Sequence, residues 1–236
     1  MSLFDRLYSL SETIFTDRRT GKETTGHLLD RFANAKGHFA KAYSLEEEIR
    51  QASKRGVIAL KNQDAQAVEE VKTRMNTAWE ELDKLDLPAD VHWKHDAQAG
   101  QELVEFHVTC WIYPNVFGGD PNLYGQLQSA LAMKVTPQCW LAGIGDAITE
   151  IGKMLIEHLC SDQLTHTERI EIRQRYISVA KEICQYLEMF EGCVPQIINN
   201  NRYRGYFNTF RGLISRIQRV IQSEQEALIR IYDTSQ

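Results

Sequence analysis

The sequence predicts an all-α protein, and three observations support this prediction. Apolar residues recur at intervals of three and four along nearly the whole chain, which is the period of an amphipathic helix. Only five of the 236 residues are prolines, so few helices are interrupted. No alternation of apolar and polar residues extends beyond a few positions, so strands are not expected. The predicted architecture is therefore a helical bundle.

The order of the helices follows from the apolar stripes. Residues 2–15 carry one such stripe and predict a short amphipathic helix, which ends at a polar break. We assign residues 1–25 to an N-terminal arm and residues 26–236 to a single all-α domain, because no repeat or linker divides them. Seven helical segments are expected in this domain, at about 26–60, 64–85, 99–113, 122–133, 137–157, 166–193 and 202–232.

Local signals place the start of two of these helices. Asp64 is a favourable N-cap for the second segment. Thr136 is a good N-cap and Pro137 suits the first helical position of the fifth segment. That helix carries Ala and Gly beside Asp146, and small residues inside a helix usually mark the close approach of another element or of a ligand.

Composition excludes several functional classes. The chain is 43% hydrophobic and 25% charged, which is typical of a soluble globular protein. No stretch approaches the ~20 apolar residues of a membrane span, and the N-terminus lacks the apolar core of a secretory signal, so a cytoplasmic protein is expected. The five cysteines show no Cys-x-x-Cys spacing and predict reduced thiols. The net charge of −5 argues against a uniformly basic nucleic-acid binder, although a local basic patch is compatible with it.

The segment 99–113 is apolar around nearly its whole circumference, so this helix is expected to be buried. It nevertheless carries Glu102 and Glu105, which are three residues apart and therefore share one face. The next turns of that face hold Phe106 and Ile112. Ionised carboxylates in such surroundings need a cation, either Lys or Arg or a metal ion.

The helix after Pro137 offers two more acids, Asp146 and Glu150, four residues apart. Four carboxylates from two facing helices would form an all-oxygen site suited to Mg²⁺ or Mn²⁺. Such a site lowers the pKa of a bound water and stabilises the charge of a phosphoryl transition state. The alternative is a structural ion-pair network, in which Lys153 and arginines neutralise the acids.

Other catalytic signatures are absent from the sequence. His107 and His158 lie on apolar helices and are interpreted as core residues rather than as ligands of a soft metal. Neither carboxylate helix has the Glu-x-x-His spacing of di-iron bundles. The chain contains no Gly-rich phosphate loop, nucleophile elbow or dinucleotide-binding fingerprint.

A second candidate region combines arginines with aromatic residues between positions 202 and 219, and no acidic residue occurs between Glu191 and Glu224. Single-stranded nucleic acid needs this combination, with charge for the phosphates and flat faces for the bases. The alternative is that the aromatics belong to the core and the arginine stems cover a helix surface. The candidate nucleic-acid contacts are Arg202, Arg204 and Arg211, extended by Lys94 and His95.

Three segments resemble the translin family. They are Gly100-Gln101-Glu102-Leu103-Val104-Glu105, Val135-Thr136-Pro137, and Leu141-Ala142-Gly143-Ile144-Gly145-Asp146 with Glu150. The closer resemblance is to translin-associated factor X (TRAX) and its single-gene microbial relatives. It covers roughly residues 40–231 in the order of helices and is specific over 100–105 and 135–155. The resemblance implies a seven-helix subunit that assembles into a hollow octamer and binds single-stranded RNA and DNA on its inner surface.

The resemblance also implies roles for particular residues. TRAX-like members are Mg²⁺-dependent endoribonucleases, and Glu102, Glu105 and Asp146 fall on their metal-binding catalytic acids, with Glu150 on a nearby acid. Translin itself lacks the first three acids and is mainly a binding partner, so their presence favours the catalytic branch. The basic, His-rich stretch that translin uses for nucleic acid is matched only loosely by residues 92–95, and residues 1–25 have no recognised counterpart.

The leading hypothesis is a Mg²⁺-dependent endoribonuclease that acts on single-stranded RNA. It would work as a homo-oligomer, such as an octamer, or as a hetero-oligomer with a translin-type chain, with the basic helix facing inward. One alternative is a translin-like nucleic-acid-binding protein without catalysis. Another is an all-α nucleotide pyrophosphatase, which also uses Glu-x-x-Glu on one helix with acids on a second. The segment 135–146 argues against the pyrophosphatase.

Overall fold

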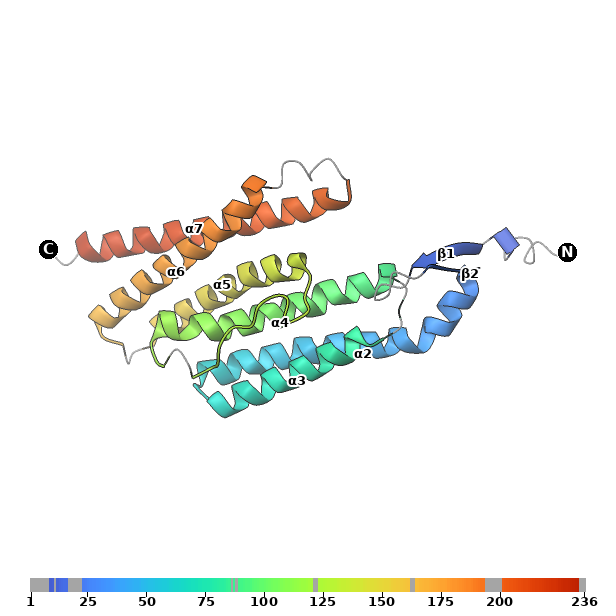
Figure 1. The fold of residues 1–236 in the computed structure, drawn as a ribbon. Coiled ribbons are helices and arrows are strands. Elements are labelled where there is room, and N and C mark those ends of the chain that lie inside the picture. The colour runs from blue at the N-terminus through green and yellow to red at the C-terminus, as the bar shows by residue number, and fades with distance from the viewer. Residues whose placement is uncertain are drawn as a thin grey trace.

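The structure, a computed structural model, describes residues 9–10, 12–16, 23–85, 87, 89–120, 123–161, 164–193 and 201–233. The described residues form six long helices and one two-stranded hairpin (Figure 1). The helices are α2 (Leu28–Lys61), α3 (Ala65–Asp83), α4 (Ala89–Phe117), α5 (Pro137–Leu159), α6 (His166–Cys193) and α7 (Asn201–Asp233). The all-α class is therefore confirmed. Within this described part, no helix is both long and apolar enough to cross a membrane.

Helix α4 is the centre of the bundle, because it packs against α2, α3, α5 and α6. Helices α2, α4 and α5 lie side by side and run in the same direction (Figure 1). Helix α6 returns along α5, and α7 packs on both of them. The face of α4 that carries the two glutamates continues into the core, where Phe106, Thr109 and Ile112 are all buried.

The helix starts that the sequence predicts are confirmed. The Asp64 carboxylate accepts a hydrogen bond of 3.0 Å from the backbone N–H of Ala67. The Thr136 hydroxyl accepts one of 3.3 Å from the backbone N–H of Cys139, and Pro137 occupies the first turn of α5. Both caps satisfy N–H groups that have no partner within their own helix.

The helix expected over residues 2–15 is wrong for its second half. Residues Glu12–Thr16 form strand β1, which pairs antiparallel with β2 (Glu23–His27), and Ile14 lies opposite Thr25. The apolar stripe of this segment suggested a helix, but residues 13–16 are all β-branched or aromatic and favour a strand once a partner is available. Residues 1–8 and 17–22 lie outside the described residues.

The short helix expected over 122–133 is also wrong, because described residues 123–133 form turns and irregular structure. Two buried side chains of α3 donate hydrogen bonds to backbone carbonyl oxygens of this segment. The indole N–H of Trp79 donates to Met133 O at 2.9 Å, and the ammonium group of Lys72 donates to Tyr124 O. Gly125, with φ of +75°, lies outside the helical region. Tertiary hydrogen bonds therefore override the helical apolar spacing.

The central helix is longer than the sequence indicated. Helix α4 begins at Ala89 and so includes the basic segment before residue 99, and it continues through Pro114 to Phe117. A proline removes one backbone hydrogen bond but does not have to end a helix. The helix ends where Gly118 and Gly119 adopt φ of +89° and +118°.

Candidate active site

Helices α4 and α5 approach each other closely where the acids lie. A Cβ atom on Gly143 would lie 2.6 Å from Cβ of Val104 and 2.8 Å from the carbonyl oxygen of Gln101. Two residues further, a Cβ atom on Gly145 would overlap the side chain of Leu213 on α7. The small residues beside Asp146 therefore admit two neighbouring helices, and the predicted close approach is confirmed.

Replacing Gly143 by alanine is expected to destabilise the protein by about 1–3 kcal/mol, because the added methyl group cannot avoid a backbone carbonyl. Gly212 on α7 is the matched control, since a Cβ atom there would meet nothing within 4 Å. Gly212→Ala should stabilise by roughly 0.5–1 kcal/mol through helix propensity. Urea unfolding of both variants checks the prediction, and an unchanged or raised midpoint for Gly143→Ala would contradict it.

The structure brings the predicted acids together. Glu102 and Glu105 extend from successive turns of α4 and Asp146 from α5, and all three are partly buried. Burial is the largest cause that raises the pKa of each carboxyl group, and for Glu105 the pKa reaches about 8. The negative charges of Glu102, Asp146 and Glu150 also raise the pKa of Glu105. A group of like charges in a partly buried position is costly without a cation.

Three of the four acids have a side-chain partner. The Gln101 amide donates to Asp146, and the Ser53 hydroxyl donates to Glu102. Lys153 forms an ion pair of 2.6 Å with Glu150, as the structural alternative predicted.

Glu105 differs from these three acids. In the part of the chain that the structure describes, its carboxyl group makes no hydrogen bond and no ion pair. Burial and neighbouring charges therefore destabilise the ionised form of Glu105 more than that of the other acids. A bound cation would stabilise this ionised carboxylate most.

The donor chemistry of this group fits a hard divalent cation. Three carboxyl groups from two helices supply only oxygen ligands, and a shared cation would offset the burial that raises all three pKa values and the repulsion that adds to it at Glu102 and Glu105. Among the described residues, however, no group of three or more His, Cys, Asp or Glu side chains is arranged to hold a metal ion. One oxygen of Asp146 accepts a hydrogen bond from the Gln101 amide, so the second carboxylate oxygen is the candidate metal ligand.

Exposed cations surround the acids. Arg50 and Lys54 on α2 both lower the pKa of Glu102, although burial outweighs them. Arg216 on α7 and Lys153 on α5 act on Asp146 in the same way. All four cationic side chains are exposed, whereas the acids are partly buried. The site therefore consists of shielded acids flanked by solvent-accessible positive charge.

The sequence did not predict the contribution of α2. Arg50, Ser53 and Lys54 lie more than forty residues before Glu102, and no motif marks them. Their helical spacing could have indicated them, because polar residues at positions i, i+3 and i+4 share one face of a helix, here beside its buried apolar stripe.

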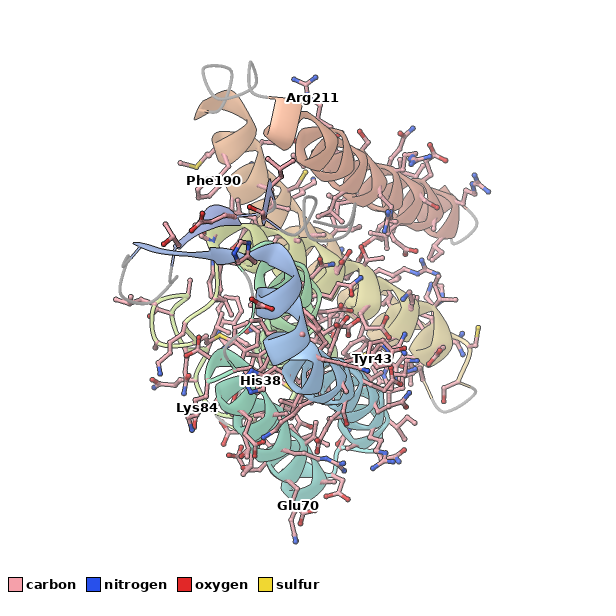
Figure 2. The ribbon with its side chains drawn as sticks, turned by 90° about the vertical axis from the view of Figure 1, so that its right-hand side faces the viewer. His38, Tyr43, Glu70, Lys84, Phe190 and Arg211 are labelled. Atoms are coloured by element: carbon pink, nitrogen blue, oxygen red, sulfur yellow. The ribbon has the colours of Figure 1, made fainter. Side chains whose placement is uncertain are left out.

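The structure describes the side chain of only one of the five predicted nucleic-acid contacts. Arg211 is exposed near the N-terminal end of α7, at one edge of the bundle (Figure 2). The side chains of Lys94, His95, Arg202 and Arg204 lie outside the described ones.

The two histidines singled out in the sequence pack against aromatic rings. The ring of His158 packs edge-on against Phe117. His107 is buried on α4, and burial, with a smaller effect from Lys72, lowers its pKa to about 4. Its Nε2 atom has no hydrogen-bond partner among the described residues. His107 is thus a neutral core residue, but its hydrogen bonding is incomplete.

No protein-family model and no curated protein matches the chain. Solved structures do. The crystal structure of AfC3PO aligns with a TM-score of 0.56 and 19% identity, over 84% of this chain and 95% of that chain. Apo-NeC3PO aligns with a TM-score of 0.53 and 18% identity, over 84% and 97%.

The chain has the C3PO fold. The all-α, translin-type architecture that the resemblance implied is thereby confirmed, with six helices in the described part of the chain where the resemblance implied seven. A structure of AfC3PO with duplex RNA also aligns, with a TM-score of 0.49 and 19% identity. At these identities the similarity establishes the architecture, and function has to be argued from the residues of the site.

Proposed function

We propose that this chain binds single-stranded RNA and hydrolyses it with the help of Mg²⁺ or Mn²⁺, for which Glu102, Glu105 and Asp146 are the ligands. One observation carries the proposal. Burial raises the pKa of three carboxyl groups that meet between α4 and α5, neighbouring acids raise those of Glu102 and Glu105 further, and the cationic neighbours are too weak to restore the ordinary values. The resemblance of the segments 100–105 and 135–155 to TRAX supports the same assignment.

When bound, the metal ion would supply an activated water and would stabilise charge on the scissile phosphate. The residues of the chain prepare the site for it. Ser53 and Gln101 orient Glu102 and Asp146 by donating hydrogen bonds to them. Glu105 holds a proton at neutral pH and has to release it to act as a ligand. We assign to Glu150, which pairs with Lys153, the role of a further ligand or of a group that orients water.

We also propose that the chain works as an oligomer, either an octamer of identical chains or an assembly with a translin-type chain. The chain is acidic overall, whereas the arginines of α7 follow one another without an intervening acid from 202 to 219. A closed assembly with α7 facing inward would present RNA with the basic surface only. A cytoplasmic location, or also a nuclear one in a eukaryotic cell, stays a prediction.

Cleavage of a labelled single-stranded RNA by the purified full-length protein tests the proposal. We expect cleavage in Mg²⁺ or Mn²⁺ and none in EDTA. The Lys153–Glu150 ion pair favours one rival, a translin-like binding protein whose carboxylates are structural. RNA binding without cleavage, together with a melting temperature that EDTA does not change, would support that rival. Release of pyrophosphate from nucleotides without RNA cleavage would support the pyrophosphatase.

A further inference from the structure

We propose that Lys54 and Arg50 on α2, and Arg216 on α7, bind the backbone phosphates on opposite sides of the scissile phosphate. The nucleic-acid strand would then cross the bundle from α2, over the acids on α4 and α5, to α7. This inference rests on the proposed function, since it needs a phosphodiester at the carboxylates.

The α2 side of this path is defined by Ser53. Its side chain is buried and donates a hydrogen bond to Glu102, which places this face of α2 beside the acid. Arg50 and Lys54 are three residues before and one residue after Ser53, so Arg50 and Lys54 lie one turn apart on the same side of the helix. Both side chains are exposed. They therefore flank Glu102 from the solvent side.

The α7 side is defined by the contact between Gly145 and Leu213. Leu213 packs where Gly145 has no side chain, one residue before Asp146. Arg216 follows Leu213 by three residues, which places it on the same face of α7 one turn further. Arg216 is exposed and acts electrostatically on Asp146. Glu102 and Asp146 thus lie between a cation from α2 and a cation from α7.

Two of these cations have no partner of their own. In the described part of the chain, neither Lys54 nor Arg216 takes part in an ion pair or a side-chain hydrogen bond. Within the same described residues, Arg50 forms an ion pair with Glu47, which lies one turn earlier and is half-buried. Exposed, unpaired cations beside partly buried acids can bind phosphate groups at little cost in free energy.

The spacing favours a polymer over a free nucleotide. Axes of neighbouring helices lie about 8–10 Å apart, and α4 and α5 separate α2 from α7. A mononucleotide carries phosphate at one position only, whereas Lys54 and Arg216 lie on opposite sides of the acids. A strand with several phosphates can contact both, and its middle phosphate then lies over the carboxylates.

Binding of a single-stranded RNA to the full-length assembled protein in EDTA gives the first test. Lys54→Gln and Arg216→Gln should each weaken binding several-fold, and each should reduce the slope of log K against log salt by about 0.7, the value for one phosphate contact on a single strand. Lys54→Arg should bind like the wild type. Arg55→Gln is the matched control, because Arg55 is also exposed on α2 and does not act on the acids. Effects in Arg55→Gln equal to those in Lys54→Gln would overturn the inference.

Single neutral methylphosphonate linkages in the same RNA give the second test. Lys54→Gln should add no further loss when the linkage that Lys54 contacts is already neutral, whereas Arg216→Gln should still weaken binding to that RNA. A linkage on the other side of the cleavage site should show the reverse. The proposed path would be overturned if Lys54→Gln and Arg216→Gln both lost their effect with the same neutral linkage, or if neither lost its effect with any linkage.

These measurements separate the inference from the proposed function. Metal-dependent cleavage together with unaffected binding in Lys54→Gln and Arg216→Gln overturns the phosphate contacts alone. The expected salt and linkage effects without any metal-dependent cleavage support the contacts and overturn the nuclease. A wild-type protein that does not bind RNA overturns both.

Discussion

Asp146→Asn is expected to lower the rate of metal-dependent RNA cleavage by on the order of 100-fold or more, and to leave RNA binding intact. Asparagine has the size of aspartate and can still accept the hydrogen bond from Gln101, so the fold should be kept. It carries no negative charge, so the site loses one of the three proposed anionic ligands. Loss of groups that only orient a ligand costs about 10–100-fold, and loss of a ligand should cost at least as much.

Single-turnover cleavage in Mg²⁺ and RNA binding in EDTA, measured on the same preparations, check this prediction. Glu157→Gln is the control, because Glu157 is also an acid on α5 but pairs with Lys61 at 2.5 Å, on the exposed surface. Normal cleavage by Asp146→Asn would show that this carboxylate is not part of the catalytic site. Loss of binding as well as cleavage would indicate a structural role.

Glu105→Gln is expected to stabilise the metal-free protein at pH 7 by up to about 3 kcal/mol. Burial, reinforced by Glu102, raises the pKa of Glu105 from 4.5 to about 8 in the folded state. Below about pH 4.5 both the folded and the unfolded state hold the proton, so its contribution to stability is fully present. As the pH rises towards 8, only the folded state holds the proton, and this contribution is lost at about 1.4 kcal/mol per pH unit. Glutamine resembles the protonated acid in shape and cannot ionise.

Urea unfolding in EDTA between pH 5 and pH 8 measures this effect. The stability of the wild type should fall across this range more steeply than that of Glu105→Gln. Glu70→Gln, on the exposed surface of α3 (Figure 2), should follow the wild type. Added Mg²⁺ should stabilise the wild type with release of a proton and should have little effect on Glu105→Gln. Identical pH profiles for the wild type and Glu105→Gln would contradict the burial of an ionisable Glu105.

Much of the fold could be predicted from local signals. The caps at Asp64 and Thr136 and the long helices α2, α3, α5, α6 and α7 follow from residue spacing, since a helix needs only its own backbone and a consistent apolar face. The predictions were wrong where contact with a second segment of the chain determined the local structure. Strand β1 forms because β2 pairs with it. Residues 123–133 are not helical, because Trp79 and Lys72 donate hydrogen bonds to backbone carbonyls of this segment.

For the candidate site, the sequence by itself determined that Glu102 and Glu105 share a face of a buried helix, and that Asp146 and Glu150 share a face of another. These are consequences of the helical period. Only the tertiary structure decided which groups meet. The missing side chain of Gly143 lets α5 approach α4, and Ser53 places the cations of α2 beside Glu102. Spacing along one helix carries no information about the neighbour across a packed interface, whereas that neighbour sets the burial and charge which raise the pKa of Glu105.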